Sequence, residues 1–237
     1  MPTDPRLLHW DACLNVRDLG GLQAGNSALA RGRLVRASII GTLSAAGRDA
    51  MRAHGIRTVI DLRGDDEVAE TPSPYAEGTA YRRVPLTALR IMALHDAAHA
   101  GTLSDELRRI AVRDGGLADA ISAIARSEPG ILLHCVAGRD RTGIVVATLL
   151  AALGVPGDEV VADYAASDIE LASEYERFKG VNPDRAGAVD EGVAKRAWVM
   201  EEVLTTLRLA FGGAEAYLRM AGVTQAELDT IRAKLLA

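Results

Sequence analysis

The sequence has little that would tie the chain to a metal ion or a nucleic acid. Its two cysteines and five histidines are scattered and match no zinc-ligand spacing. We therefore expect no metal cofactor and no other cofactor. Lysine and arginine number 27 against 32 aspartates and glutamates, which gives a net charge of −5. A general nucleic-acid binder is usually basic, so no nucleic-acid partner is expected.

Long apolar runs are also lacking. The first ten residues, MPTDPRLLHW, have no apolar core of the kind found in signal peptides. The longest apolar run, around Ile144–Val155, is too short to cross a bilayer. Two cysteines far apart in the sequence favour a reduced protein. These absences predict a cytoplasmic protein without stable membrane insertion. Export without a cleavable signal and the oligomeric state stay open.

Aromatic residues make up only 4% of the 237-residue chain, so the core must be mostly aliphatic. Apolar, β-branched segments predict four strands, at Arg33–Ala37, Arg57–Leu62, Tyr81–Pro85 and Ile131–Leu133. Apolar spacing and capping residues predict helices from Ser44 to about His54, over Gly116–Arg126 and from Arg141 to Leu153. Most of the chain after Asp158 is also predicted to be helical, and Thr224 with Glu227 forms a capping box there.

Strands that alternate with helices indicate an α/β fold, a sheet with helices on its faces. No linker marks a second domain, so we expect residues 1–237 to form a single domain. Its helical C-terminal portion, residues 158–237, either packs on the sheet or forms a lid.

One segment carries most of the chemistry. Residues 134–143, HCVAGRDRTG, connect a predicted strand to a predicted helix and are called the phosphate loop below. A helix N-terminus binds anions, because its first-turn N–H groups point at the ligand and its dipole favours negative charge. Gly138 allows the positive φ that a tightly curled loop requires. The predicted substrate-binding residues are Val136, Ala137, Gly138, Arg139 and Asp140.

Two side chains of this loop suit phosphoryl transfer. Cys135 follows the strand and is the predicted nucleophile, because a thiolate beside a helix N-terminus and cations is stabilised and reactive. Arg141, six positions later, can hold two phosphate oxygens with its planar fork. The Thr142 hydroxyl can donate to the thiolate. His134 is expected to fix the loop through hydrogen bonds rather than to transfer protons. The sequence therefore predicts hydrolysis through a phosphocysteine intermediate.

The pattern H-C-x5-R-[ST]-G resembles the signature of the protein tyrosine phosphatase superfamily. HCVAGRDRTG is similar to the HC-x-A-G-K-D-R-T-G loop of a bacterial tyrosine phosphatase family related to dual-specificity and lipid phosphatases. Other segments resemble it too, namely NVRDLGG at Asn15–Gly21, RGRLVRAS at Arg31–Ser38, GIRTVIDLR at Gly55–Arg63 and VVADYAAS at Val160–Ser167.

The resemblance implies a mostly parallel sheet of four or five strands flanked by helices, with a helical lid in some members. It also implies activity on phosphotyrosine and, in some members, on phosphoserine, phosphothreonine or phosphoinositides. Arg139 stands where the family usually has lysine. The charge is kept but the geometry changes, which leaves activity on lipid headgroups open.

The general acid, which must protonate the leaving oxygen, is the least defined residue. The sequence has no Trp-Pro-Asp segment of the kind that many superfamily members use. The resemblance points to Asp61 at the end of its strand, where parallel-sheet enzymes build sites. Asp61 could instead be a strand-end residue paired with Arg63. Asp140 is a second candidate, and the remaining ones lie in an unassigned stretch: Asp96, Asp105, Asp114 and Asp119.

Simpler roles compete with some of these assignments. Arg139 and Asp140 could form a solvated ion pair, and Arg17 with Asp18 is expected to brace the loop. Cys13 is expected to be a packed thiol, since cysteine is commonly buried. Two other classes of protein stay open, a phosphate-binding module without catalysis and a rhodanese-like sulfurtransferase. The first has no need of both Cys135 and Arg141, and the second has no need of the Arg-Thr-Gly ending.

Overall fold

The computed structural model describes residues 4–73, 81–86, 97–98, 100–113 and 116–237. Its central sheet has five strands in the order β1-β4-β7-β5-β6. Their bounds are β1 Arg17–Asp18, β4 Leu34–Ala37, β5 Thr58–Asp61, β6 Tyr81–Arg83 and β7 Ile131–His134. Strand β1 is antiparallel to β4, and the other pairs are parallel. The mostly parallel α/β sheet expected from the sequence is confirmed, and each of the four predicted strands is present.

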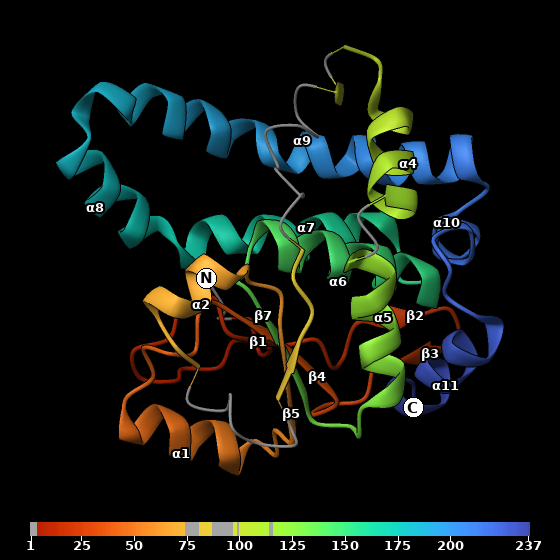
Figure 1. The fold of residues 1–237 in the computed structure, drawn as a ribbon, viewed down its shortest axis with the longest axis horizontal. Helices are drawn as coiled ribbons and strands as arrows, with labels where there is room; N and C mark the ends of the chain where they lie inside the picture. The colour runs from red at the N-terminus through yellow and green to blue at the C-terminus, as the bar shows by residue number, and fades with distance from the viewer. Residues whose placement is uncertain (1–3, 74–80, 87–96, 99, 114–115) are drawn as a thin grey trace.

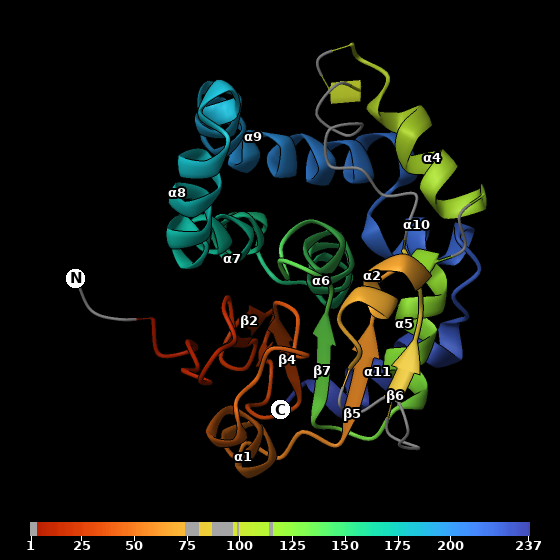
Figure 2. The ribbon, with the colours of Figure 1, turned by 60° about the vertical axis from the view of Figure 1, so that its left-hand side comes forward.

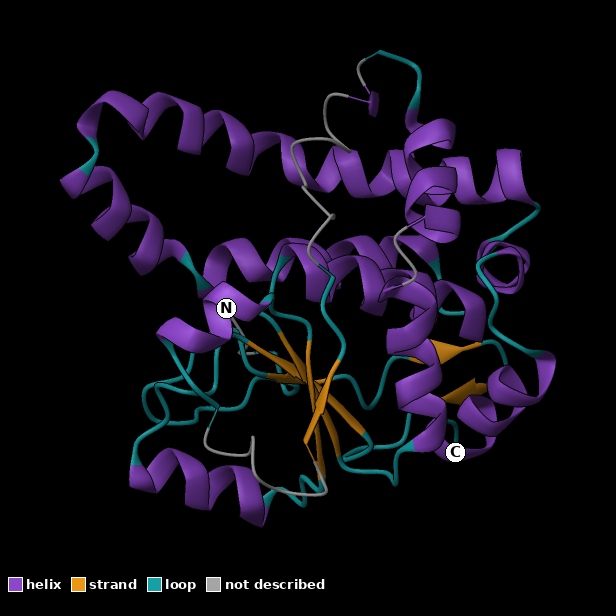
Figure 3. Cartoon of the chain, in the orientation of Figure 1, coloured by secondary structure: helices purple, strands orange, loops and turns teal. Residues whose placement is uncertain are grey.

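Helices cover both faces of the sheet and extend beyond it (Figure 1, Figure 3). Their bounds are α1 Ala45–Ala53, α2 Asp65–Glu70, α4 Leu103–Arg113, α5 Gly116–Arg126, α6 Asp140–Leu153, α7 Gly157–Glu170, α8 Ala172–Val181, α9 Ala186–Phe211, α10 Ala214–Met220 and α11 Gln225–Leu235, with a short 3-10 turn at Pro183–Arg185. The C-terminal third is therefore helical, as predicted. None of these described helices is long and apolar enough to cross a membrane.

The central strands β4, β5 and β7 are buried on both faces, so their apolar side chains alternate between two cores. Val35, Val59 and Leu132 pack with Met51 of α1 on one face. Residues such as Ile60 and Leu133 face the opposite core, which contains side chains of α5, α6, α10 and α11. The central strands thus form a rigid layer, and they hold in place the loops that follow them.

Local signals in the sequence set several helix ends. The Ser44 side chain accepts a hydrogen bond from Gly47 N and begins α1, as predicted. Thr224 and Glu227 form the predicted capping box of α11. Helix α6 ends at Gly154, whose φ of 89° lies in the left-handed region that glycine tolerates.

A small hairpin of β2 (Gln23–Ala24) and β3 (Ser27–Ala28) lies apart from the main sheet, beside α11 (Figure 3). The C-terminus is tied to this hairpin, because Ala237 N donates to Ala28 O over 2.9 Å. At the other end of the molecule, α8 connects α7 to α9, and α9 runs back above α7 (Figure 1).

The carboxyl ends of the parallel strands point toward α2 and α6 (Figure 2). Strand β7 leads directly into the phosphate loop and α6, and the neighbouring β5 leads into α2. Ligand sites of open parallel sheets are formed at this edge. The topology therefore places the residues after β5 and β7 next to each other.

Candidate active site

The carbonyl groups of the phosphate loop are turned away from its centre. Val136 O accepts a hydrogen bond from Ile39 N (2.8 Å), and His134 O accepts one from Leu62 N (2.9 Å). At the other end of the loop, Arg139 O accepts from Gly143 N (2.6 Å). Within the described part of the chain, no hydrogen bond outside the regular helices and strands uses the N–H groups of residues 136–141. These amides are therefore available to an anion in the loop.

Glycine is required at the tightest point of the loop. Gly138 has a φ of 66°, which confirms the predicted left-handed conformation. A Cβ atom at this position would collide with the carbonyl of Ala37 at the end of β4. Any larger residue would therefore push the loop away from the sheet.

Cys135 lies at the end of β7 and is 2% exposed. The next residue, Val136, is 41% exposed, so the loop opens to solvent immediately beside the cysteine. The Oγ1 atom of Thr142 is buried and has no hydrogen-bond partner among the described residues. An unpaired buried hydroxyl is costly, so this group is suited to donate to a charged atom in the loop.

Arg141 is held by a residue that the sequence did not single out. Its two terminal nitrogens bind the two carboxylate oxygens of Glu67 at 2.5 and 2.7 Å. Glu67 belongs to the first turn of α2 and also accepts from Gly64 N (2.8 Å). Burial lowers the pKa of Arg141, but Glu67 and the nearby Cys135 outweigh burial and raise it. The guanidinium is thus charged and oriented.

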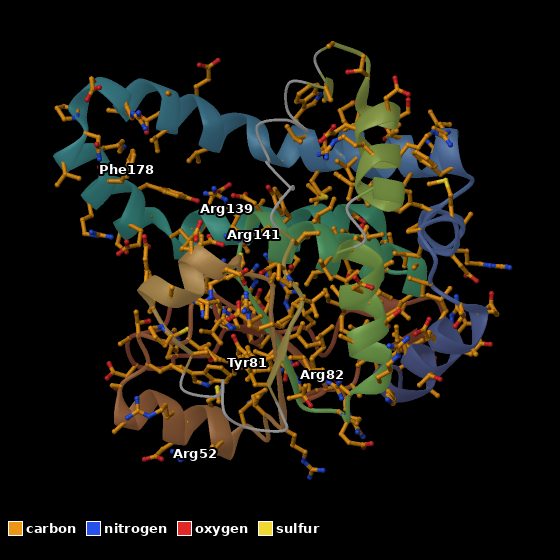
Figure 4. The ribbon with its side chains drawn as sticks, viewed as in Figure 1. Arg52, Tyr81, Arg82, Arg139, Arg141 and Phe178 are labelled. Atoms are coloured by element: carbon orange, nitrogen blue, oxygen red, sulfur yellow. The ribbon has the colours of Figure 1, made fainter. Side chains whose placement is uncertain are left out.

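Arg139 and Asp140 form an ion pair, the simpler alternative considered for them, with Arg139 Nε 2.7 Å from Asp140 Oδ1. Their side chains are only 13% and 25% exposed, so the pair is partly buried. Arg139 also donates to the hydroxyl of Tyr175 on α8 and packs over its ring. Figure 4 shows Arg139 and Arg141 close together at the N-terminal end of α6. The loop therefore presents two arginines beside the anion site.

Asp61 lies behind the loop and is itself fully buried. Its carboxylate accepts from Arg63 Nη2 (2.7 Å) and from the Tyr81 hydroxyl (2.7 Å). Burial raises the pKa of Asp61, but these hydrogen bonds and His134 outweigh it and hold the pKa below its usual value. A general acid must carry a proton and reach the substrate. Both the pairing and the burial therefore count against Asp61 as the acid, and they favour the strand-end pair with Arg63.

His134 connects this cluster to the loop. Its Nδ1 lies 3.1 Å from Cys135 O, and its Nε2 lies 3.5 Å from Asp61 Oδ2. Burial lowers the pKa of His134 despite the neighbouring carboxylate, which keeps the ring neutral near pH 7. A neutral ring protonated on Nδ1 donates to the Cys135 carbonyl, which supports the positioning role expected from the sequence.

The other acid candidates gain no support. Asp105 and Asp119 are exposed in the first turns of α4 and α5. No described hydrogen bond or ion pair links either of them to the phosphate loop. Asp96 and Asp114 lie outside the described residues.

A second group of buried side chains holds the phosphate loop through its backbone carbonyls. Asn15 Nδ2 donates to Ala137 O (2.9 Å), and Arg36 Nη2 donates to Gly138 O (2.8 Å). Asn15 has a φ of 58°, and Arg17 donates to its side-chain oxygen. These contacts fix the two carbonyls at the turn of the loop.

The carboxylate of Asp163 on α7 anchors this group. It binds Arg17 Nε (3.1 Å), Arg36 Nη1 (2.5 Å) and Arg6 Nη1 (3.2 Å). Burial raises the pKa of Asp163, but the three arginines outweigh burial and lower it to about 2. The site thus includes Glu67, Arg36 and Asp163, which the sequence interpretation missed. We call Asn15, Arg17, Arg36 and Asp163 the brace.

The expectation for Arg17 and Asp18 is met only in part. Arg17 reaches the loop through Asn15, whereas the carboxylate of Asp18 bonds to Gly20 N, Gly32 N and His54 Nε2. Asp18 therefore holds the segment between β1 and β4 and not the loop.

The remaining cysteine, Cys13, is a buried free thiol. Cys13 is 8% exposed, and burial raises the pKa of its thiol to about 11, as suits a packed cysteine. Among the described residues, no group of three or more His, Cys, Asp or Glu side chains is arranged to hold a metal ion.

The sequence of the chain is similar to those of known proteins over most of its length. A sequence profile described as the tyrosine phosphatase family matches residues 8–237. A tyrosine-protein phosphatase of Nostoc commune is 32% identical, over 88% of this chain and 76% of that protein. The triple specificity protein phosphatase PtpB of Mycobacterium tuberculosis is 30% identical, over 94% of this chain and 96% of that protein.

Proposed function

The chain belongs to the tyrosine phosphatase family, and from that premise we propose that it hydrolyses phosphotyrosine with Cys135 as nucleophile and the phosphate loop as anion site. Phosphoserine, phosphothreonine and phosphoinositides are further candidate substrates, as the name of the mycobacterial relative suggests. The observation that carries the proposal is the orientation of the loop, whose carbonyls are bonded outward while its amides stay available.

In the first step, the Cys135 thiolate attacks phosphorus and the phosphorus–oxygen bond to the substrate breaks. The phosphoryl group is then carried on sulfur as phosphocysteine. In the second step, water attacks this intermediate, inorganic phosphate leaves, and the thiolate is restored. The Thr142 hydroxyl, buried and without a described partner, donates to the sulfur and makes it a better leaving group.

Arg141 binds two oxygens of the phosphoryl group and stabilises the charge that they carry in the transition state. Glu67 positions it, because a bidentate pair fixes both the position and the plane of the guanidinium. The guanidinium has five N–H groups, so the bonds to Glu67 leave others for phosphate.

We assign the general acid to Asp140. Both candidates are paired with an arginine, Asp140 with Arg139 and Asp61 with Arg63, so exposure distinguishes them. Asp140 is the first residue of α6 and its side chain is 25% exposed, whereas Asp61 is fully buried. A bound phosphate would attract Arg139 and so weaken its hold on Asp140. Asp140 would protonate the leaving oxygen in the first step and accept the proton of water in the second.

The test is hydrolysis of p-nitrophenyl phosphate by the purified protein in the presence of EDTA. The proposal expects activity that vanadate inhibits and that Cys135→Ser abolishes. A folded Cys135→Ser variant with substantial activity, or a wild-type protein that needs added metal, would refute it. A folded wild-type protein that binds phosphate but hydrolyses no p-nitrophenyl phosphate would instead be a phosphate-binding module.

A further inference from the structure

A large cavity runs along one side of the phosphate loop. Its volume is about 970 Å³, which exceeds the space that a phosphotyrosine side chain needs. Val136 and Ala137 form part of its wall, so the cavity is continuous with the loop. The other walls come from residues 8–15, from the segment after β4, and from the end of α7 with the start of α8.

Part of the wall is apolar and accessible. Leu14 is 37% exposed and Val136 is 41% exposed, and Trp10, Ile39 and Leu171 also line the cavity. Apolar groups that remain exposed beside a reactive site are suited to contact a ligand. The cavity can therefore accept an uncharged side chain next to the phosphorylated group.

The charged part of the wall is mainly acidic. The lining includes the carboxylates of Asp11, Glu170 and Glu174 and the guanidinium of Arg177. Arg177 pairs with Glu174, with Nη2 2.5 Å from Oε2. Asp11 and Glu170 have no ion pair among the described residues.

Glu170 is the last residue of α7, and only Leu171 separates it from the first residue of α8, Ala172. The negative end of one helix dipole and the positive end of the next therefore lie side by side at Glu170, and their effects on its carboxylate oppose each other. The negative charge on this side of the cavity comes from the carboxylates of Asp11 and Glu170 themselves.

We propose that this cavity binds the residues flanking the phosphotyrosine of a protein substrate and selects peptides with an apolar and a basic side chain there. The proposal rests on the proposed function and names the substrate class of the same site. A lysine or arginine complements Asp11 and Glu170. A polyphosphorylated inositol headgroup would bring further negative charge against these carboxylates, so the observations favour a phosphopeptide.

The experiment compares kcat/KM for two phosphotyrosine peptides that differ only by Lys or Glu next to an apolar residue beside the phosphotyrosine. At low salt the wild-type protein should prefer the lysine peptide by about tenfold, as expected for a few solvent-exposed charge pairs. The preference should shrink at high salt through screening. A short-chain phosphatidylinositol bisphosphate serves as the lipid arm.

Variants of the cavity wall test which carboxylates cause the preference for the lysine peptide. Asp11→Asn combined with Glu170→Gln should reduce the preference to about twofold, because both proposed charge pairs are lost. The same variant should leave p-nitrophenyl phosphate hydrolysis unchanged, since that substrate lacks the flanking residues that Asp11 and Glu170 would contact. Glu176→Gln is the matched control, because it removes a carboxylate of α8 that does not line the cavity.

Three results would overturn the proposal: equal rates for the two peptides, a preference that survives the double variant, or faster hydrolysis of the lipid than of the lysine peptide. In each of these cases hydrolysis of p-nitrophenyl phosphate would still stand. Failure of the proposed function itself would appear separately, as no hydrolysis of p-nitrophenyl phosphate.

Discussion

Arg36→Lys tests whether the brace is needed for catalysis. Arg36 is 1% exposed and uses two nitrogens, Nη1 to Asp163 at 2.5 Å and Nη2 to Gly138 O at 2.8 Å. A lysine ammonium is one compact charge that keeps the ion pair but cannot also reach the loop carbonyl. The loss of a hydrogen bond from a charged donor should lower the free energy of unfolding by about 2 kcal/mol.

The loop should then lose its alignment. Small displacements of reacting groups cost up to about 100-fold in rate, so we expect kcat/KM to fall by about 10- to 100-fold. The assay measures kcat and KM on p-nitrophenyl phosphate, the inhibition constant of vanadate, and urea unfolding. Arg33→Lys, at an exposed arginine just before β4, is the control. A folded Arg36→Lys protein that is less stable but has normal kcat and vanadate affinity would refute the reasoning.

Further predictions concern Arg141, the general acid and the buried carboxylate of Asp163. Arg141→Lys should lower kcat by at least ~100-fold, about 2.7 kcal/mol, whereas a near-normal kcat would make the residue structural. Asp140→Asn should lower kcat for an alkyl phosphoester by about 10²- to 10⁴-fold but kcat for p-nitrophenyl phosphate far less, because only the poor leaving group needs protonation. Asp61→Asn should lower kcat for both substrates equally. The reverse pattern would assign the general acid to Asp61. Because the pKa of Asp163 is lowered from 3.8 to about 2, its contribution to stability is complete above about pH 4 and is lost as the pH falls toward 2. A carbon NMR titration of Asp163 with a midpoint above 3.8 would contradict this.

The sequence predicted those parts of the structure that depend on neighbouring residues. The phosphate loop, the positive φ of Gly138 and the caps at Ser44 and Thr224 each follow from a few adjacent side chains. The alternation of short apolar strands with helices was sufficient for the fold class, because each element carries its own pattern.

Contacts between distant residues could not be predicted in this way. Glu67 and Arg141 are 74 positions apart, and Arg36 and Asp163 are 127 apart. The sequence does set apart the two carboxylates of these pairs, Glu67 and Asp163. Glu67 is the third residue of a helix after Gly64, and Asp163 follows an apolar stretch, an unusual place for a charge. Only the folded structure shows which arginines these two carboxylates bind.

Asp61 illustrates the same limit at short range. The sequence correctly places it at the carboxyl end of a strand, next to the loop. Whether such a carboxylate is an acid or an anchor depends on its partners and burial. Arg63 and Tyr81 supply those partners, and neither their direction nor their burial follows from the strand pattern.

The central claim is that the phosphoryl group passes through Cys135. The most direct measurement is a rapid acid quench during turnover of p-nitrophenyl phosphate, followed by peptide mass spectrometry. The account predicts one phosphoryl group, on the peptide that contains Cys135, and none in Cys135→Ser. Turnover with no phosphorylated peptide at any quench time, or with the phosphoryl group on the peptide of Cys13, would contradict it.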